Sequence, residues 1–182
     1  VKDAQRHGVE VLPVDVDRSG WGCRFEGGAV RIGLSYVHGL AQAVGERIEA
    51  ERSRGPFRDP ADLAQRAGLK EEQLARLAHV GALASLGLSR RQALWQVAEV
   101  AARRGPLLAA LPPEEGSPLP EMSPFEETVA DYGGLHLTTG PHLLAYLRPW
   151  LDRHGVVPLA RLEQASDGAP VRAAGAVIVR QR

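Results

Sequence analysis

The chain has 182 residues, 44% of them hydrophobic, and its 22 basic side chains balance 22 acidic ones. This length suits one medium domain or a domain with appendages, and the composition is apolar enough to bury a core. A single cysteine, Cys23, excludes an internal disulfide framework and fits a reducing cytoplasm, where we expect the protein to be located. No apolar run approaches the ~20 residues that cross a bilayer, and no signal peptide is visible, so we expect no membrane partner. Zero net charge argues against indiscriminate binding of polyanions.

The two ends of the sequence are unusual. It starts at Val1, has its one methionine at position 122, and stops at Arg182 within a run typical of a strand. We therefore expect a part excised from a longer protein.

Residues 1–30 predict a short helix and a small β-hairpin. The helix is stopped by Gly8, and residues 9–12 predict a short extended piece. Gly27-Gly28 is a favourable two-residue turn between extended stretches. Between these elements, Asp15-Val16-Asp17 has turn chemistry. Two carboxylates at this spacing could hold a metal, but without further carboxylates at fixed offsets a capping or solvated loop is favoured.

Residues 36–48 organise the rest of the chain. A short apolar stretch leads into Gly39, Leu40 and Ala41, here called turn 1, and an amphipathic helix follows with Val44 and Ile48 on one face. Gly39 allows a tight reversal in which a Cβ would collide, and the helix starts with unpaired N–H groups at the positive end of its dipole. Such a helix-hairpin-helix turn can hold a phosphate through the backbone without reading a base. An ordinary helical corner is the alternative.

The pattern recurs about forty residues later. Gly81, Ala82 and Leu83, here called turn 2, end one helix, and a second helix opens at Ser89. Two such units are too few for a solenoid and suggest a paired module that grips successive phosphates. Residues 31–104 therefore predict a tandem helix-hairpin-helix DNA-binding domain in a mainly α-helical fold.

The remaining third of the chain divides by composition. Five prolines make residues 105–123 a semi-extended linker. Residues 124–168 predict a helical connector, whose first helix begins with a cap at Ser123 and an acid at Glu126 and ends at Gly133-Gly134. Residues 169–182 alternate like the first strand of a barrel whose partner strands lie beyond the end of the chain. We expect this segment to be mobile or to pair with another molecule.

The candidate DNA-binding groups are the backbone N–H groups of the two turns and polar side chains on the helices that follow them. They are Gly39, Leu40, Ala41, Arg47, Arg52, Gly81, Ala82, Leu83, Ser89, Arg90 and Arg91. For Arg90 and Arg91 the alternative is that they are exposed to solvent and do not contact DNA.

Other polar residues carry no recognisable chemistry. His38 and His79 each precede a turn glycine, where packing at a helix end is favoured over metal or acid–base roles. No nucleophile elbow, triad spacing or metal-ligand cluster links the Asp, Ser and His residues. We therefore expect no catalytic residue, metal or cofactor in this chain.

Several motifs resemble bacterial C-family DNA polymerases, in the family's order and over nearly the whole chain, and two of them resemble the error-prone branch in particular. The family motifs are His7-Gly8-Val9-Glu10-Val11-Leu12-Pro13, Asp15-Val16-Asp17-Arg18-Ser19, Val30-Arg31-Ile32-Gly33-Leu34-Ser35-Tyr36-Val37-His38-Gly39-Leu40, Val80-Gly81-Ala82-Leu83-Ala84-Ser85-Leu86-Gly87, Asp131-Tyr132 and Gly140-Pro141-His142. The two branch motifs are Leu88-Ser89-Arg90-Arg91-Gln92-Ala93-Leu94-Trp95 and Val177-Ile178-Val179-Arg180-Gln181-Arg182.

The resemblance implies a parent nucleotidyltransferase of DNA replication and translesion repair, which extends template-primer DNA with two Mg²⁺ ions held by palm carboxylates. In the family that palm precedes the segment present here. The chain would then comprise the end of the fingers (1–30), the tandem helix-hairpin-helix domain, and the start of an oligonucleotide-binding domain (169–182). It would bind duplex DNA behind the active site, in the cytoplasm at the nucleoid, and incorporate no nucleotide.

The chain departs from the family pattern in two places, the first of which affects the expected partners. Residues 105–111 lack the Gln and Phe of a sliding-clamp motif, so direct clamp binding is doubtful and accessory translesion proteins are expected instead. The family's His-Pro pair is His142-Leu143 here.

Two further functions compete with DNA binding. Helix-hairpin-helix pairs also serve as protein docking modules, and the zero net charge is compatible with that role. Salt-dependent binding to primed DNA separates the two hypotheses. An independent small enzyme would need a catalytic constellation that the sequence does not contain.

Overall fold

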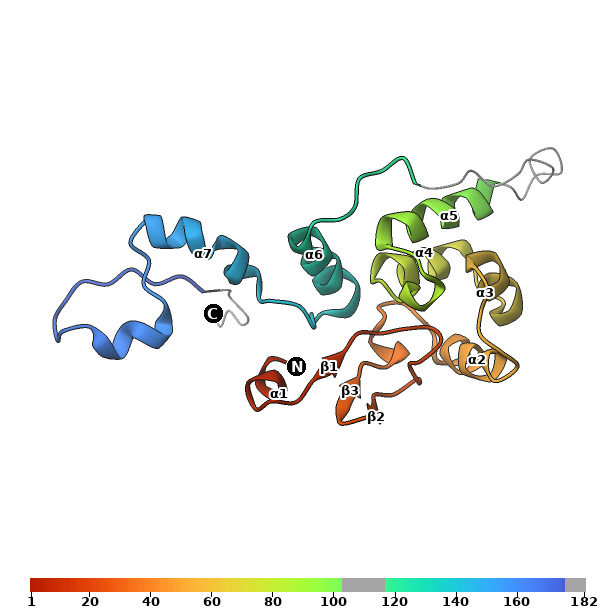
Figure 1. The fold of residues 1–182 in the computed structure, drawn as a ribbon, viewed down its shortest axis with the longest axis horizontal. Coiled ribbons are helices and arrows are strands. Elements are labelled where there is room, and N and C mark those ends of the chain that lie inside the picture. The colour runs from red at the N-terminus through yellow and green to blue at the C-terminus, as the bar shows by residue number, and fades with distance from the viewer. Residues whose placement is uncertain (103–116, 176–182) are drawn as a thin grey trace, which may run out of the picture. The chain divides into compact units, whose positions relative to one another are not determined.

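The computed structural model describes residues 1–102 and 117–175, which belong to two compact units, Val1–Thr139 and Gly140–Arg182. The fold is mainly α-helical, as predicted, with one small sheet near the N-terminus (Figure 1). The segment 105–111, considered above for clamp binding, lies outside the described residues. Among the residues that are described, no helix is both long enough and apolar enough to cross a membrane.

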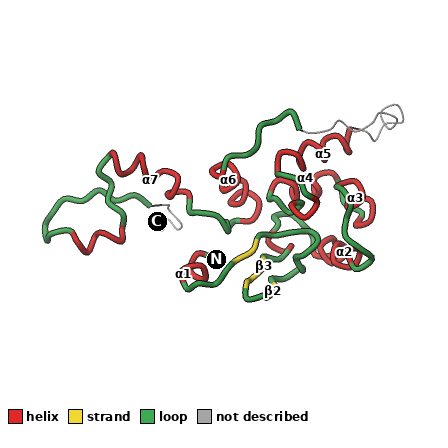
Figure 2. The backbone as a smooth tube through the Cα atoms, viewed as in Figure 1, coloured by secondary structure: helices red, strands yellow, loops and turns green. Residues whose placement is uncertain are grey.

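The N-terminal elements are α1 (Lys2–Arg6) and three short strands, β1 (Val11–Leu12), β2 (Arg24–Glu26) and β3 (Ala29–Arg31) (Figure 2). The predicted hairpin is confirmed: β2 and β3 pair antiparallel across Gly27-Gly28, with Phe25 opposite Val30. The expected extended piece at residues 9–12 contributes β1, which pairs parallel with β3 in the sheet order β1-β3-β2. The sequence pattern did not indicate this partner.

Turn 1 lies between a short 3-10 helix, η1 (Leu34–Tyr36), and α2 (Gln42–Arg52). The helix that a helix-hairpin-helix pattern implies before turn 1 is therefore not formed, and a single 3-10 turn takes its place. Gly33 precedes this turn with its backbone packed against that of Trp21 and Gly22, where a Cβ would collide. The chain thus enters η1 in an extended conformation and has only a few residues before turn 1.

The helices α3 (Pro60–Ala67) and α4 (Glu71–His79) form where capping chemistry predicts them. Asp59 accepts a hydrogen bond from the Asp62 N–H at 2.7 Å, and Gly68 ends α3 in the left-handed conformation. The Lys70 N–H donates to the Gln73 side chain at 2.9 Å at the start of α4. These local bonds fix the helix boundaries.

Turn 2 leads through η2 (Ala84–Leu86) into α5 (Arg90–Ala102), and α6 (Pro124–Leu135) follows the linker. Ser123 and Glu126 form the expected capping box of α6. This helix continues past the predicted end at residues 133–134 to Leu135, and His136 closes it with a positive φ of 57°.

One hydrophobic core joins the helices of the first unit to the loop after β1. Its fully buried side chains come from η1, α2, α3, α4 and turn 2, and the loop adds Val14 and Val16. Burying each large aliphatic side chain contributes about 1.5–3 kcal/mol. The core members below 2% exposure are Leu34, Ile48, Leu63, Leu74, Leu77, Leu83, Val14, Val16 and others.

Residues 13–19 form a loop that ties turn 2 to α2. The buried Asp15 accepts hydrogen bonds from the N–H groups of Asp17 (2.9 Å) and Ser85 (3.1 Å). The Val16 N–H donates to the carbonyl of Ala82 at 2.9 Å. The favoured interpretation of Asp15 and Asp17 as a capping loop is confirmed, because the Asp15 carboxylate accepts hydrogen bonds from a backbone amide of its own loop and from one that follows turn 2.

The second unit contains α7 (Leu143–Arg153), η3 (Leu159–Gln164) and a β-bridge between Val156 and Arg172. The Val157 N–H donates to the Arg172 carbonyl at 2.8 Å. The expectation that the C-terminal segment has no partner in its own chain is therefore wrong at Arg172, because the extended stretch after α7 offers backbone groups to it. Residues 176–182 of the predicted strand lie outside the described residues.

The domain boundaries predicted from composition stay a prediction. The connector proposed for 124–168 is divided between the two units, since α6 belongs to the first and α7 to the second.

Acid unfolding tests the capping of α3. The buried Asp62 accepts hydrogen bonds from the Arg58 guanidinium (3.0 Å), from the Arg58 N–H (3.1 Å) and from Arg66 (3.3 Å), and these lower its pKa from 3.8 to about 2. Because the folded pKa is below the unfolded value, this contribution to stability is complete above the unfolded pKa and is lost as the pH falls through the folded one. We predict that Asp62→Asn lowers the free energy of unfolding at pH 7 and that its deficit against wild type shrinks as the pH falls between the two pKa values, measured by urea unfolding across that range.

The matched control is Asp152→Asn, which removes a carboxylate from an exposed i,i+4 pair with Arg148. A deficit for Asp62→Asn that does not change with pH would contradict this account of α3.

Candidate nucleic-acid interface

Turn 1 presents its backbone to solvent while its one apolar side chain is buried. Gly39 has a φ of +75°, in the left-handed region that favours glycine, and both Gly39 and Ala41 are exposed. Leu40 is only 6% exposed and its N–H donates to the Val37 carbonyl at 3.1 Å. The buried Leu40 side chain anchors the turn, so the chain reverses with its polar backbone facing outward.

The start of α2 has no capping side chain. The residue at its N-cap is Ala41, which has the extended backbone typical of a cap but no acceptor to offer. Among the other helices of eight or more residues in the described part of the chain, α3, α5, α6 and α7 have a side chain that accepts a hydrogen bond from a first-turn amide, from Asp59, Ser89, Ser123 and His142. At α4 the Gln73 side chain accepts from the N–H of Lys70, the residue before the helix. The exposed amides of Ala41, Gln42 and Ala43 are therefore available to an outside acceptor.

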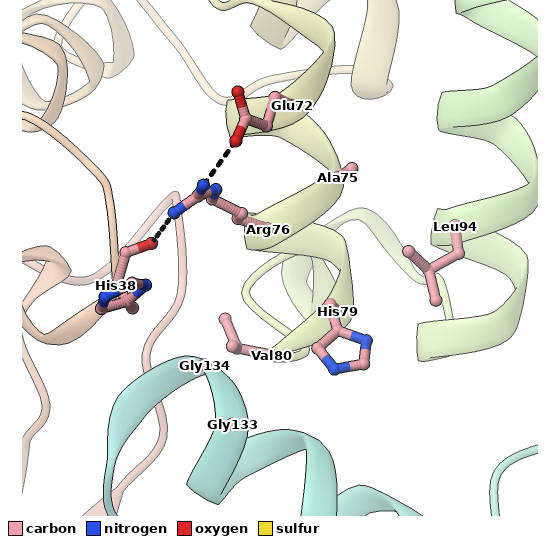
Figure 3. A pocket seen from close by; sticks show the side chains of 9 residues that line it. All are labelled: His38, Glu72, Ala75, Arg76, His79, Val80, Leu94, Gly133 and Gly134. Carbon is pink, nitrogen blue, oxygen red and sulfur yellow. Dashed lines mark hydrogen bonds and ion pairs between the residues drawn. The ribbon is translucent and has the colours of Figure 1, made fainter.

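Arg76 of α4 crosses to turn 1. Its guanidinium donates to the His38 carbonyl at 2.7 Å and also pairs with Glu72 (Figure 3). It lies where a Cβ on Gly39 would be, so the turn needs glycine for space as well as for its φ.

A hollow of about 490 Å³ lies beside this contact, between α4 and α6 (Figure 3). Its polar groups are His38, Arg76, Glu72 and His79, and the Gly133-Gly134 backbone of α6 forms one wall. The side chains around it form no nucleophile–base pair, so we assign it no catalytic chemistry.

Turn 2 has the same backbone reversal but a different environment. Gly81 has a φ of +77°, while Ala82 and Leu83 are fully buried. The Gly81 and Ala82 N–H groups donate to the carbonyls of Ala78 (3.1 Å) and Leu77 (2.9 Å). Two residues after the turn, the Ser85 N–H donates to the Asp15 carboxylate. Internal carbonyls thus occupy two of the three turn 2 amides that the sequence suggested for phosphate, and the third belongs to the fully buried Leu83.

The predicted side chains at the start of α5 also have internal partners. The Ser89 hydroxyl accepts from the Gln92 N–H at 3.3 Å. The Arg90 guanidinium pairs with Asp131 at 2.7 Å, with both side chains largely buried, and Arg91 pairs with Glu126 at 3.1 Å. These arginines join α5 to α6, and their contact with DNA stays a prediction.

The two arginines predicted on α2 have different surroundings. Arg52 donates to the carbonyls of Val16 (3.2 Å) and Ser19 (2.5 Å), and burial lowers its pKa. These hydrogen bonds join α2 to the loop 13–19. Arg47 is exposed and lies over Gly68, where α3 ends, so it is the predicted cation that remains open to solvent.

The histidines and carboxylates offer no metal centre. Within the ranges 1–102 and 117–175, no three His, Cys, Asp or Glu side chains come together in a group that could hold a metal ion. Burial, followed by the charge of Arg90, lowers the pKa of His79, which favours the neutral form of the ring. His38 makes an edge contact with the His136 ring, with centroids 5.4 Å apart.

Sequence reasoning missed two contributors to turn 1. The amides of Gln42 and Ala43 extend the exposed donor row, and the missing cap at Ala41 was a signal that could have revealed them. Arg76 had no such signal, since its contact with His38 joins residues 38 positions apart.

Comparisons with known proteins fit this geometry. A family described as the helix-hairpin-helix motif matches residues 8–93. The whole chain is 43% identical over 195 residues to the error-prone DNA polymerase of Anaeromyxobacter dehalogenans strain 2CP-C, and 45% identical over 189 residues to that of Alkalilimnicola ehrlichii. It is 38% identical over 182 residues to the error-prone DNA polymerase of Corynebacterium glutamicum. The chain spans 17–18% of the length of these relatives.

Two glycine substitutions separate backbone strain from collision at turn 1. Gly39 and Gly87 have nearly equal φ values of +75° and +74°, but a Cβ on Gly87 would meet open space. We predict that Gly87→Ala costs about 1–2 kcal/mol from left-handed strain. Gly39→Ala should cost about 1 kcal/mol more, because Arg76 must leave the His38 carbonyl. Urea unfolding of the two variants measures the difference, and equal costs would show that Arg76 does not constrain the turn.

Proposed function

We propose that this chain, which is homologous over its whole length to a segment of error-prone DNA polymerases, binds the phosphate backbone of duplex DNA without reading its sequence. The binding groups are the exposed amides of turn 1 and of the first residues of α2. Gly39, Leu40 and Ala41 shape and present them, and Arg47 adds an exposed positive charge.

The uncapped start of α2 is the observation that carries this proposal. A phosphate oxygen accepts hydrogen bonds from backbone N–H groups and is attracted by the positive end of a helix dipole. At residues 41–43 these donors are exposed and lack a side-chain acceptor, whereas at turn 2 the amides of Gly81 and Ala82 donate to internal carbonyls. Backbone amides make no distinction between bases, so binding would be independent of sequence.

The surrounding charge predicts modest affinity. Arg76 contacts turn 1 and Arg47 lies on the helix that follows it, but Arg76 is paired with Glu72 and the chain as a whole is neutral. We therefore expect Kd values of about 10⁻⁴–10⁻⁶ M at physiological salt, the range of non-specific contacts. Within a full polymerase, such a site would add to other DNA contacts.

In this role the segment binds DNA and does not catalyse nucleotide incorporation. The parent would be a DNA-directed DNA polymerase of translesion synthesis that uses Mg²⁺ held outside this segment, and it would rely on accessory translesion proteins. Template-directed extension by the purified segment would contradict this division of roles.

Ala41→Asp tests the site without weakening the fold. An aspartate at this N-cap can accept hydrogen bonds from the amides of α2, so it should stabilise the protein by about 0.5–2 kcal/mol. The same carboxylate would occupy the proposed site and repel phosphate. We predict higher stability together with clearly weaker binding to primed duplex DNA and a smaller salt dependence, measured by fluorescence anisotropy across a salt series.

The matched control is Ala145→Asp, which adds the same charge at an exposed position in the first residues of α7. This variant should bind DNA like the wild type. If both variants lose DNA affinity equally, the loss is due to the change in net charge, and this result would contradict the assignment of the site to turn 1. Absence of salt-dependent DNA binding by the wild type would favour a protein docking module instead.

A further inference from the structure

Turn 1 is held from two sides through the residue that precedes its glycine. On one side, Arg76 of α4 donates to the His38 carbonyl at 2.7 Å. On the other side, the His38 N–H donates to the Gly134 carbonyl of α6 at 2.8 Å, and the His38 ring contacts His136. Both polar groups of the peptide backbone at His38 are thus engaged, one by each helix.

The helix α6 is in turn fixed by a buried ion pair. The Arg90 guanidinium pairs with one Asp131 oxygen at 2.7 Å, and the Thr138 hydroxyl donates to the other at 2.7 Å. The side chains of Arg90 and Asp131 are 14% and 8% exposed. Arg90 also donates to the Glu127 carbonyl at 3.1 Å and to the His79 carbonyl at 3.3 Å. One guanidinium therefore joins the end of α4, the start of α5 and the middle of α6.

Close packing leaves α6 little freedom where it meets the end of α4. A Cβ on Gly134 would collide with the Val80 side chain, so this contact needs glycine. Farther along, the hollow of about 490 Å³ lies between α4 and α6 beside His38 (Figure 3). Because side chains do not fill that space, the hydrogen bond from His38 to Gly134 has an important share in fixing turn 1 on the α6 side.

We propose that Asp131 is a positioning residue for the phosphate site, although it lies on a helix that follows the linker and is far from that site in sequence. It holds α6 on Arg90, so that the Gly134 carbonyl fixes His38 and thereby the direction of the amides that follow Gly39. A binding turn held in its bound conformation does not lose the free energy needed to order it. This inference rests on the proposed function of turn 1.

Asp131→Asn in the full 182-residue chain tests the proposal with two measurements. The first is hydrogen exchange of the His38 amide by NMR, which we expect to accelerate while exchange at Ile48, in the core of α2, is unchanged. The second is affinity for primed duplex DNA, which we expect to fall by about 2- to 30-fold, the range typical of coupling through a packed network. Asp152→Asn, at the exposed pair with Arg148, is the control and should change neither.

Gly134→Ala provides an independent variant that leaves the buried ion pair intact. It should displace α6 from Val80 and produce the same two changes, and it decides the question if Asp131→Asn fails to fold. Lower stability without faster exchange at His38 would show a merely structural role and overturn the proposal. A folded variant that binds primed duplex DNA as tightly as the wild type, and whose His38 amide exchanges at the wild-type rate, would also overturn the proposal. If the wild type does not bind duplex DNA, the proposed function fails, and His38 exchange still decides whether Asp131 positions the turn.

Discussion

The left-handed backbone at Gly39 and Gly81 is the constraint on which the helix arrangement depends. The two φ values differ by only 2°, and in each turn a guanidinium from a neighbouring helix lies against the glycine. Arg76 donates to the carbonyl of His38, and Arg90 donates to that of His79. The two reversals therefore share one arrangement, in which an arginine from a neighbouring helix holds the turn and the elements on both sides of it pack around one core.

The device is shared, but the outward surfaces of the turns differ. At turn 2 the chain uses Val16 and Asp15 to satisfy backbone groups, so the reversal is sealed by the loop 13–19. At turn 1 the cap position is an alanine, and the amides remain exposed. We interpret turn 2 as the scaffold and turn 1 as the binding surface. Arg52 and Arg90 do not form a broad basic surface, because each is bonded within the fold, Arg52 to the Val16 carbonyl and Arg90 to the Asp131 carboxylate.

The sequence predicted what is decided by a few consecutive residues. The cap at Ser123, the turn at Gly27-Gly28 and the two glycine turns at Gly39 and Gly81 each depend on local geometry, and all are present. The contacts that were not predicted join distant residues, such as Arg90 with Asp131, 41 positions later. Nothing in a local pattern distinguishes an arginine that is solvated from one that is buried against a carboxylate.

The prediction of the site was also limited where it depended on contacts between residues distant in sequence. The glycine spacing located both turns, because a positive φ favours glycine regardless of the surroundings. Whether a turn amide is free depends on which segment folds against it, and the loop 13–19 that covers turn 2 is more than sixty residues away in sequence. The absence of a cap at Ala41 was readable from sequence, and it separates the two turns better than their glycines do.

Amide chemical shifts during titration with a short primed duplex test the central claim most directly. The account predicts that the largest shifts occur at Gly39, Ala41, Gln42 and Ala43, with smaller changes at Gly81 and Ala82, and that they disappear as salt is raised. Shifts centred on turn 2 or on α7, with residues 39–43 unchanged, would contradict it.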